Sequence, residues 1–101
     1  MGWATKYIEG LRSGQTVKFR PTGKSMEPKV KSGQLVTVEP VTDETVLEKN
    51  DIVLCKVNGS QFLHLIWDVC GDQYRIGNNK GHDNGRIDRS KIYGKCVKIE
   101  D

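Results

Sequence analysis

A serine, a histidine and an aspartate, far apart in the chain, are the side chains best suited to chemistry. Ser25 lies in a run with glycine and proline, His64 in an apolar run, and Asp83 in a polar run further on. A serine hydroxyl is a poor nucleophile until a neighbouring base takes its proton. A neutral imidazole can do this near neutral pH, and a carboxylate can hold its second ring nitrogen. The three residue types are therefore compatible with nucleophilic catalysis through Ser25, with His64 as base and Asp83 as the orienting group.

The run around Ser25 reads Thr-Gly-Lys-Ser-Met-Glu-Pro over residues 22–28 and contains the Gly-Lys-Ser of a phosphate-binding loop. A P-loop also needs a glycine where Lys18 stands, and a helix that begins at the serine. Pro28 predicts a turn there instead. Backbone N–H groups of a turn over residues 23–25 suit an oxyanion hole, because Gly23 permits close approach of a substrate. We therefore expect a turn and no nucleotide site here.

A hairpin predicted around Asn58-Gly59 positions His64. Asn-Gly between two β-like runs is the favoured sequence of a two-residue type I′ turn. Because side chains alternate along a strand, His64 falls on the same face as apolar residues of both runs. Such a face lowers the pKa of a histidine and keeps its neutral form available as a base. The predicted register pairs Val57 with Ser60, Cys55 with Phe62, and Val53 with His64.

The remaining pattern indicates one domain over residues 1–101, mainly β, with a short helix before a β core at 16–99. Four apolar residues recur at helical spacing before Gly14 and predict an amphipathic helix over residues 3–12. They are Trp3, Tyr7, Ile8 and Leu11. Short β-like runs then alternate with turn residues, which predicts a small, partly open β-barrel. The expected strands are residues 16–20, 35–40, 51–57, 61–67, 73–76 and 91–99.

Several short boxes resemble those of the signal-peptidase/LexA-like serine peptidases. The nucleophile box of that family is a Gly-x-Ser-Met-x-Pro turn before a Gly-Asp and a strand, and it resembles residues 23–28 with Gly33 and the run 36–38. The family's Gly-Asp-Ile-Val strand start is similar to residues 50–53. Its base follows the hairpin turn, where bacterial members carry lysine, the endoplasmic-reticulum type carries histidine, and this chain has His64. A third box, Gly-Asp-Asn-x followed by Asp, resembles residues 77–79 with Asp83.

The resemblance covers residues 16–99 and implies a partly open barrel of the LexA/signal-peptidase type. It implies a protein or peptide substrate bound as an added strand, with small residues before the cut, and no metal or cofactor. The chain departs from the family pattern at Gln34, Asn50 and Leu65, where the family has Asp, Gly and Arg. The implied catalytic residues are Ser25, His64 and Asp83, and the implied oxyanion and substrate turn contains Gly23, Lys24 and Met26.

We interpret the chain as a cytosolic or phage-type processing peptidase that cleaves one peptide bond of a partner protein. One alternative, favoured by the three departures, is a peptidase fold without activity that serves as a binding module. Another is a small nucleic-acid-binding β-barrel, although no aromatic residues are evidently interleaved with the basic residues of the C-terminal third. Those basic residues are Lys80, Arg86, Arg89, Lys91, Lys95 and Lys98.

Each candidate also has a simpler structural explanation. Ser25 is compatible with an ordinary turn serine, His64 with a hydrogen-bonded core histidine, and Asp83 with a turn over residues 82–85. Asp88 competes with Asp83 for the orienting role. His82 competes with His64 for the role of base, but a loop histidine lacks the anchor of a strand.

The composition is that of an ordinary soluble globular protein, with 101 residues, 36% hydrophobic and 29% charged. The net charge of +3 is small for an obligate nucleic-acid binder. Three cysteines without a CxxC pair disfavour a disulfide framework or a zinc ribbon and suit a reducing cytosol. The longest apolar stretch, residues 62–69, is interrupted by His64 and Asp68, so we expect no membrane anchor and a cytoplasmic location.

Overall fold

A short helix packs against the sheet at the start of the chain. In the computed structural model, which describes residues 2–101, α1 spans Thr5–Arg12 and buries Ile8 and Leu11. Gly14 follows at φ +86, a left-handed conformation that glycine adopts without strain, and its N–H donates to the carbonyl of Leu11. The helix predicted over residues 3–12 is thus confirmed, with a start two residues later.

Seven antiparallel strands form the rest of the fold. The strands are β1 (Val17–Phe19), β2 (Leu35–Pro40), β3 (Ile52–Val57), β4 (Ser60–Cys70), β5 (Gln73–Gly77), β6 (Asp83–Asp88) and β7 (Ile92–Glu100). All but β6 coincide with predicted strands. The alternative interpretation of residues 82–85 as a turn is wrong, because residues 83–88 pair with β5 at every position except Asn84. Asp, Asn and Gly are depleted in strands, so the local propensity of these residues did not predict β6.

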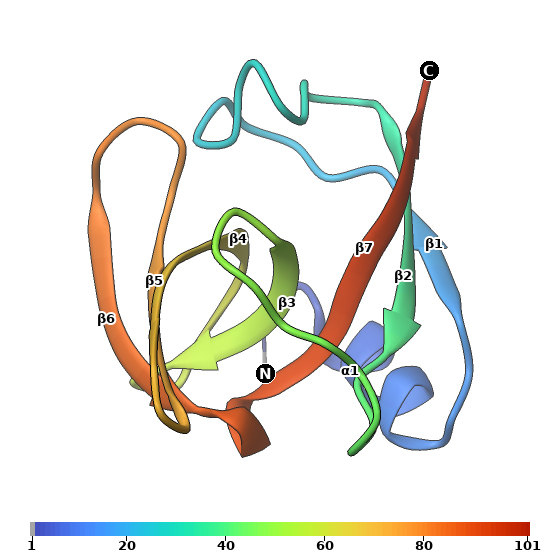
Figure 1. Cartoon of the computed structure of the whole chain (residues 1–101). Coiled ribbons are helices and arrows are strands. Elements are labelled where there is room, and N and C mark those ends of the chain that lie inside the picture. Colours follow the sequence, from blue (N-terminus) through green and yellow to red (C-terminus); the bar gives the residue numbers. More distant parts are fainter. Residues whose placement is uncertain (1) are drawn as a thin grey trace.

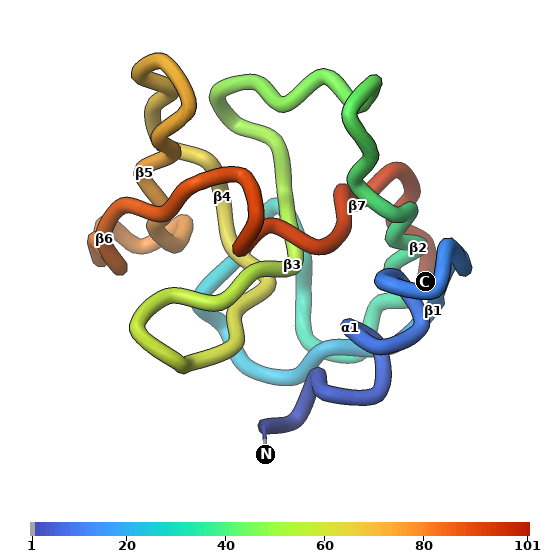
Figure 2. Tube along the Cα trace, turned by 90° about the horizontal axis from the view of Figure 1, so that it is seen from below, coloured from blue at the N-terminus to red at the C-terminus, as the bar shows by residue number. Residues whose placement is uncertain are grey.

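The sheet has the strand order β1-β2-β7-β3-β4-β5-β6 and curls on itself. Figure 1 shows β1 and β2 on one side, β5 and β6 on the other, and β3 and β4 between them, an arrangement that Figure 2 repeats from below. The curl brings β6 into contact with β3. Within residues 2–101 the two outer strands, β1 and β6, do not pair with each other. The fold is therefore the predicted partly open, mainly β barrel.

The β3–β4 hairpin has the predicted register. Val57 pairs with Ser60, Cys55 with Phe62, and Val53 with His64. Asn58 and Gly59 both have positive φ, 51° and 83°, as a type I′ turn requires. This turn aligns the strand that carries His64.

Both faces of the central strands are buried. Leu54 of β3 belongs to a cluster that includes α1 and the turn after β1, whereas Val53 and Cys55 belong to a second cluster with β5 and β6. Leu65 and Ile66 of β4 divide between the two clusters in the same way. This two-sided burial makes β4 a rigid support for a functional side chain.

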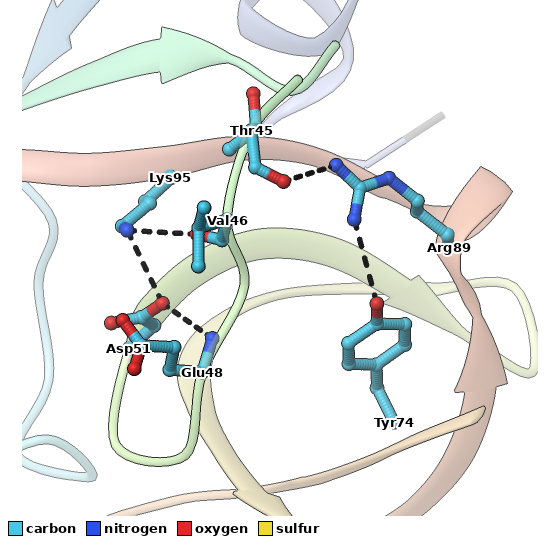
Figure 3. Close-up of polar contacts among 7 residues, drawn as sticks. All are labelled: Thr45, Val46, Glu48, Asp51, Tyr74, Arg89 and Lys95. Atoms are coloured by element: carbon cyan, nitrogen blue, oxygen red, sulfur yellow. Dashed lines mark hydrogen bonds and ion pairs between the residues drawn. The ribbon is translucent and has the colours of Figure 1, made fainter. Parts of the chain in front are cut away.

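Two basic side chains secure the long connection between β2 and β3 (Figure 3). Arg89 donates to the carbonyls of Thr42 and Thr45. Lys95 donates to the carbonyl of Val46 at 2.9 Å and pairs with Asp51 at 3.3 Å. Figure 3 draws the contacts to Thr45, Val46 and Asp51. These two cations of the C-terminal third are therefore engaged within the fold. Among residues 2–101, no helix has the length and apolar character that a bilayer crossing requires.

Candidate active site

Ser25 lies in the segment between β1 and β2, which crosses the top of Figure 1 in light blue and cyan. Met26 and Val30 are both buried in the core and anchor this segment. The N–H of Val30 donates to the carbonyl of Met26 at 3.0 Å, and residues 25–29 form turns. The predicted turn is confirmed, and no helix begins at Ser25 as a P-loop would require.

His64 lies opposite Ser25, on β4. The Ser25 Oγ and the His64 Nε2 are 3.3 Å apart, although 39 positions separate the two residues in the chain. The imidazole is 7% exposed and stacks on the ring of Phe62 at a centroid distance of 4.7 Å. Burial lowers the pKa of His64 below its ordinary value of 6.5, the Asn84 hydrogen bond opposes this shift, and the charge of His82 adds to it. A buried neutral imidazole within reach of a hydroxyl is the arrangement that general-base catalysis needs.

Asn84, and not Asp83, contacts the second ring nitrogen. The Asn84 Oδ1 is 2.6 Å from the His64 Nδ1. Because this amide oxygen only accepts, Nδ1 donates to it and Nε2 is left free to accept a proton from Ser25. Sequence reasoning missed Asn84, and its only signal was its place directly after the expected Asp83.

A β-bulge explains why Asn84 is aimed at His64. Ile76 of β5 pairs with Gly85, and Gly77 pairs with Asp83, so Asn84 is the extra residue of β6. Bulges re-aim side chains and recur beside functional sites. Asp83 is directed to Arg75, with which it forms an exposed ion pair. The structure therefore differs from the expectation that Asp83 orients the base.

The rival residues Asp88 and His82 have other contacts. The Asp88 carboxylate accepts from the backbone N–H of Ser90 at the short helical turn Arg89–Lys91, and the Ser90 hydroxyl holds the pKa of Asp88 below its usual range. His82 lines the same cleft as His64, and its N–H donates to the Asn78 side chain. Of the two histidines in the sequence, His64 is the one within hydrogen-bond distance of the Ser25 hydroxyl.

The segment after β5 braces the turn that carries Ser25. The Asn79 N–H donates to the carbonyl of Ser25 at 2.8 Å, and its side-chain amide donates to the carbonyl of Glu27 at 2.8 Å. The indole of Trp67 donates to the carbonyl of Asn78 at 3.1 Å. A side chain at Gly77 would come within 2.1 Å of the Trp67 ring, so only glycine fits there. The third box of the sequence thus positions the turn that carries Ser25.

The three departures from the family pattern are accommodated in the fold. Gln34 accepts from the N–H of Lys31 at 2.8 Å and donates to Asp101 at 2.9 Å. Asn50 has φ 77°, a region that asparagine adopts more readily than most residues other than glycine. Leu65 is buried in the core. All three residues are thus accommodated in a structure in which Ser25 and His64 are in contact.

A cleft of about 730 Å³ contains Ser25, His64 and Asn84. Gly23 lines it at φ +99, where an L side chain would be strained. Met26 lines it with a buried side chain, and Lys24 is exposed beside it. No aspartate or glutamate within residues 2–101 lines this cleft, whereas Arg20 and Lys31 do. The cleft is large enough for several residues of a peptide.

Residues 3–97 match the family model described as Peptidase S24-like. A search of curated protein sequences finds no significant match. The family match includes α1, the strands β1 to β6 and most of β7.

Proposed function

Because the chain belongs to the Peptidase S24-like family, we propose that it is a serine endopeptidase that cleaves a peptide bond of a partner protein. The observation that carries this proposal is the 3.3 Å contact between the Ser25 Oγ and the His64 Nε2, in a cleft of peptide size. The cytoplasmic location and the processing of a partner protein stay predictions.

In the proposed mechanism, Nε2 of His64 takes the hydroxyl proton while Oγ of Ser25 attacks the carbonyl carbon of the scissile bond. The imidazolium then gives that proton to the leaving amine, and the acyl group stays on Ser25 as an ester. A water molecule, deprotonated by His64, attacks the ester. The carboxylic acid leaves and the proton returns to Ser25.

Asn84 has the role of a positioning residue in this scheme. Its amide oxygen holds the Nδ1–H form of His64 and keeps the ring aimed at Ser25. A neutral amide stabilises the imidazolium less than a carboxylate does, since it lacks a full negative charge. The base therefore keeps a low pKa and is neutral in the resting protein.

The turn over residues 23–25 is proposed to stabilise the oxyanion. The left-handed conformation of Gly23 leaves its Cα side open, with nothing within 4 Å of where a Cβ would stand. Backbone N–H groups beside the nucleophile are suited to the negative charge that develops on the carbonyl oxygen.

An added-strand mode of binding is compatible with the open sheet. Within residues 2–101, β1 pairs with β2 alone, and its chain continues into Arg20, Pro21 and Thr22, which line the cleft. An extended peptide beside this segment would use main-chain hydrogen bonds for affinity and the cleft for specificity.

A fluorophosphonate probe tests the proposal, because it phosphonylates a serine only when an adjacent base activates it. We expect one covalent adduct on the wild-type chain and none on Ser25→Ala. Ser13→Ala is the matched control, since Ser13 is an exposed serine that bonds to the helix carbonyl of Glu9. Absence of labelling in the folded wild type, or labelling that survives Ser25→Ala, would contradict the proposed function.

A further inference from the structure

Three aromatic side chains, from the residues before α1, from α1 and from β1, line the cleft. Phe19 stacks on Tyr7 at a centroid distance of 4.4 Å and meets the edge of Trp3 at 5.7 Å. Phe19 is buried, whereas Trp3 is 50% exposed. Trp3 is the one aromatic residue among the exposed large hydrophobic side chains within residues 2–101.

The exposed indole of Trp3 is held in place. Its Nε1–H donates to the backbone carbonyl of Gln61 at 3.2 Å, and Gln61 lies on β4, the strand that carries His64. The Gln61 side chain accepts from the N–H of Ala4 at 2.7 Å and donates to Thr5 at 2.9 Å. Because the ring is already fixed, a ligand that covers it loses little conformational entropy of the protein.

The charged residues that line the cleft indicate which kind of residue would lie next to an apolar side chain of a bound ligand. Arg20 and Lys31 line the cleft, and no acidic residue of the described part of the chain does. The guanidinium of Arg20 is fixed by a hydrogen bond to the carbonyl of Gly33 at 2.8 Å. The surface therefore combines a rigid aromatic face with positive charge.

We propose that Trp3, Tyr7 and Phe19 form a specificity subsite for a bulky apolar side chain of the peptide substrate, next to an acidic residue of the same peptide. The inference rests on the proposed function in that the occupant is a peptide continuous with the one at Ser25. Trp3 and Tyr7 remain partly exposed above the buried Phe19, and rigid aromatic residues of this kind are typical anchors of recognition. The N-terminal helix thereby contributes to substrate choice as well as to the core.

Selection from a displayed library of random peptides tests the inference on the Ser25→Ala chain, which binds but cannot cleave. We expect the selected peptides to share a Phe, Tyr, Trp or Leu at one position and an Asp or Glu near it. Peptides without a bulky apolar preference would overturn the inference, and this readout needs no further variant.

A synthetic peptide of the selected sequence then compares variants in the Ser25→Ala background. We expect Trp3→Ala to weaken binding about tenfold or more, as removal of an interface anchor does. Val97→Ala is the matched control, since Val97 is a comparably exposed apolar residue on β7, outside the cleft lining, and should leave affinity unchanged. Equal affinity of Trp3→Ala and its parent would overturn the inference.

These outcomes are separable from those of the proposed function, because binding needs no chemistry at Ser25. Failed fluorophosphonate labelling together with selection of apolar–acidic peptides would reject the peptidase and retain the subsite. Successful labelling without selection of apolar–acidic peptides would retain the peptidase and reject the subsite.

Discussion

The Asn84 side-chain oxygen lies 2.6 Å from the Nδ1 of His64, on the far side of the ring from the Ser25 hydroxyl. Asn84 reaches this place because it is the extra residue of a bulge in β6. A neutral amide thus occupies the position expected for the carboxylate of Asp83. The presence of an amide in place of a carboxylate beside Nδ1 determines how Ser25 and His64 should respond to substitution and to pH.

Asn84→Ala should slow labelling of Ser25 by roughly 10- to 100-fold, less than the full contribution of a general base, since the imidazole stays but is no longer oriented. Asn84→Asp should retain labelling and move the acidic limb of the pH profile upward, because a carboxylate raises the pKa of His64. Labelling rates measured against pH distinguish the two effects. Asp83→Asn is the control and should change the rate by less than about twofold, since it removes an exposed ion pair but keeps the side-chain oxygen that accepts from the N–H of Gly85. A larger loss in Asp83→Asn than in Asn84→Ala would restore the orienting role to Asp83.

The rate of labelling should fall only when the pH drops below 6.5, the ordinary pKa of histidine. Burial lowers the pKa of His64, so the neutral base persists to a lower pH than in an exposed histidine. The rate is therefore level above pH 6.5 and declines as the pH falls through the lowered pKa. Removal of the neighbouring charge in His82→Gln should shift this decline toward higher pH. A rate that keeps rising into alkaline pH would indicate a lysine base and contradict the role of His64.

Gly77→Ala should destabilise the fold by about 1–3 kcal/mol, as overpacking does, because the new methyl would overlap the Trp67 ring. It should also slow labelling of Ser25, since displacement of Trp67 disturbs the brace formed by Asn78 and Asn79. Urea denaturation measures the first effect. In the Trp67→Ala background the same substitution should cost much less, because the two residues are in contact. Additive costs in the double variant would reject the steric explanation.

Arg89→Ala should lower the free energy of unfolding by about 1–3 kcal/mol, because the carbonyls of Thr42 and Thr45 lose their charged donor. Chemical denaturation checks this value. Lys91→Ala removes an exposed cation of the same segment and should change stability by less than about 0.5 kcal/mol. If the two variants are equally stable, Arg89 does not secure the β2–β3 connection.

The register of the β3–β4 hairpin could be predicted because it depends on neighbours in the chain. Asn58 and Gly59 are adjacent residues that both favour a positive φ, which fixes the turn and the register. The alternation of side chains along the strand then determines on which face of the sheet His64 lies. The turn at Ser25 was predictable for a similar reason, since Pro28 restricts the backbone after it and Gly23 permits a positive φ before it.

Strand β6 could not be predicted from its own residues. The run of Asp83, Asn84 and Gly85 has a low intrinsic preference for β structure, and its pairing with β5 outweighs that preference. Side chains of adjacent strand residues face opposite sides, so a contact assigned to Asp83 in place of Asn84 is an error of one position that reverses the face.

By itself the sequence determined the short-range features of this protein: the helix, the hairpin register and the turn around Ser25. These follow from backbone preferences and side-chain periodicity, which act over a few residues. The candidate pair of Ser25 and His64 came instead from the resemblance of short boxes to the peptidase family. Only the tertiary structure decided which polar side chain meets the Nδ1 of His64, because that depends on the curl of the sheet, the bulge at Asn84 and the competing attraction of Arg75 for Asp83. Contacts between strands distant in sequence carry this information, and no local pattern records them.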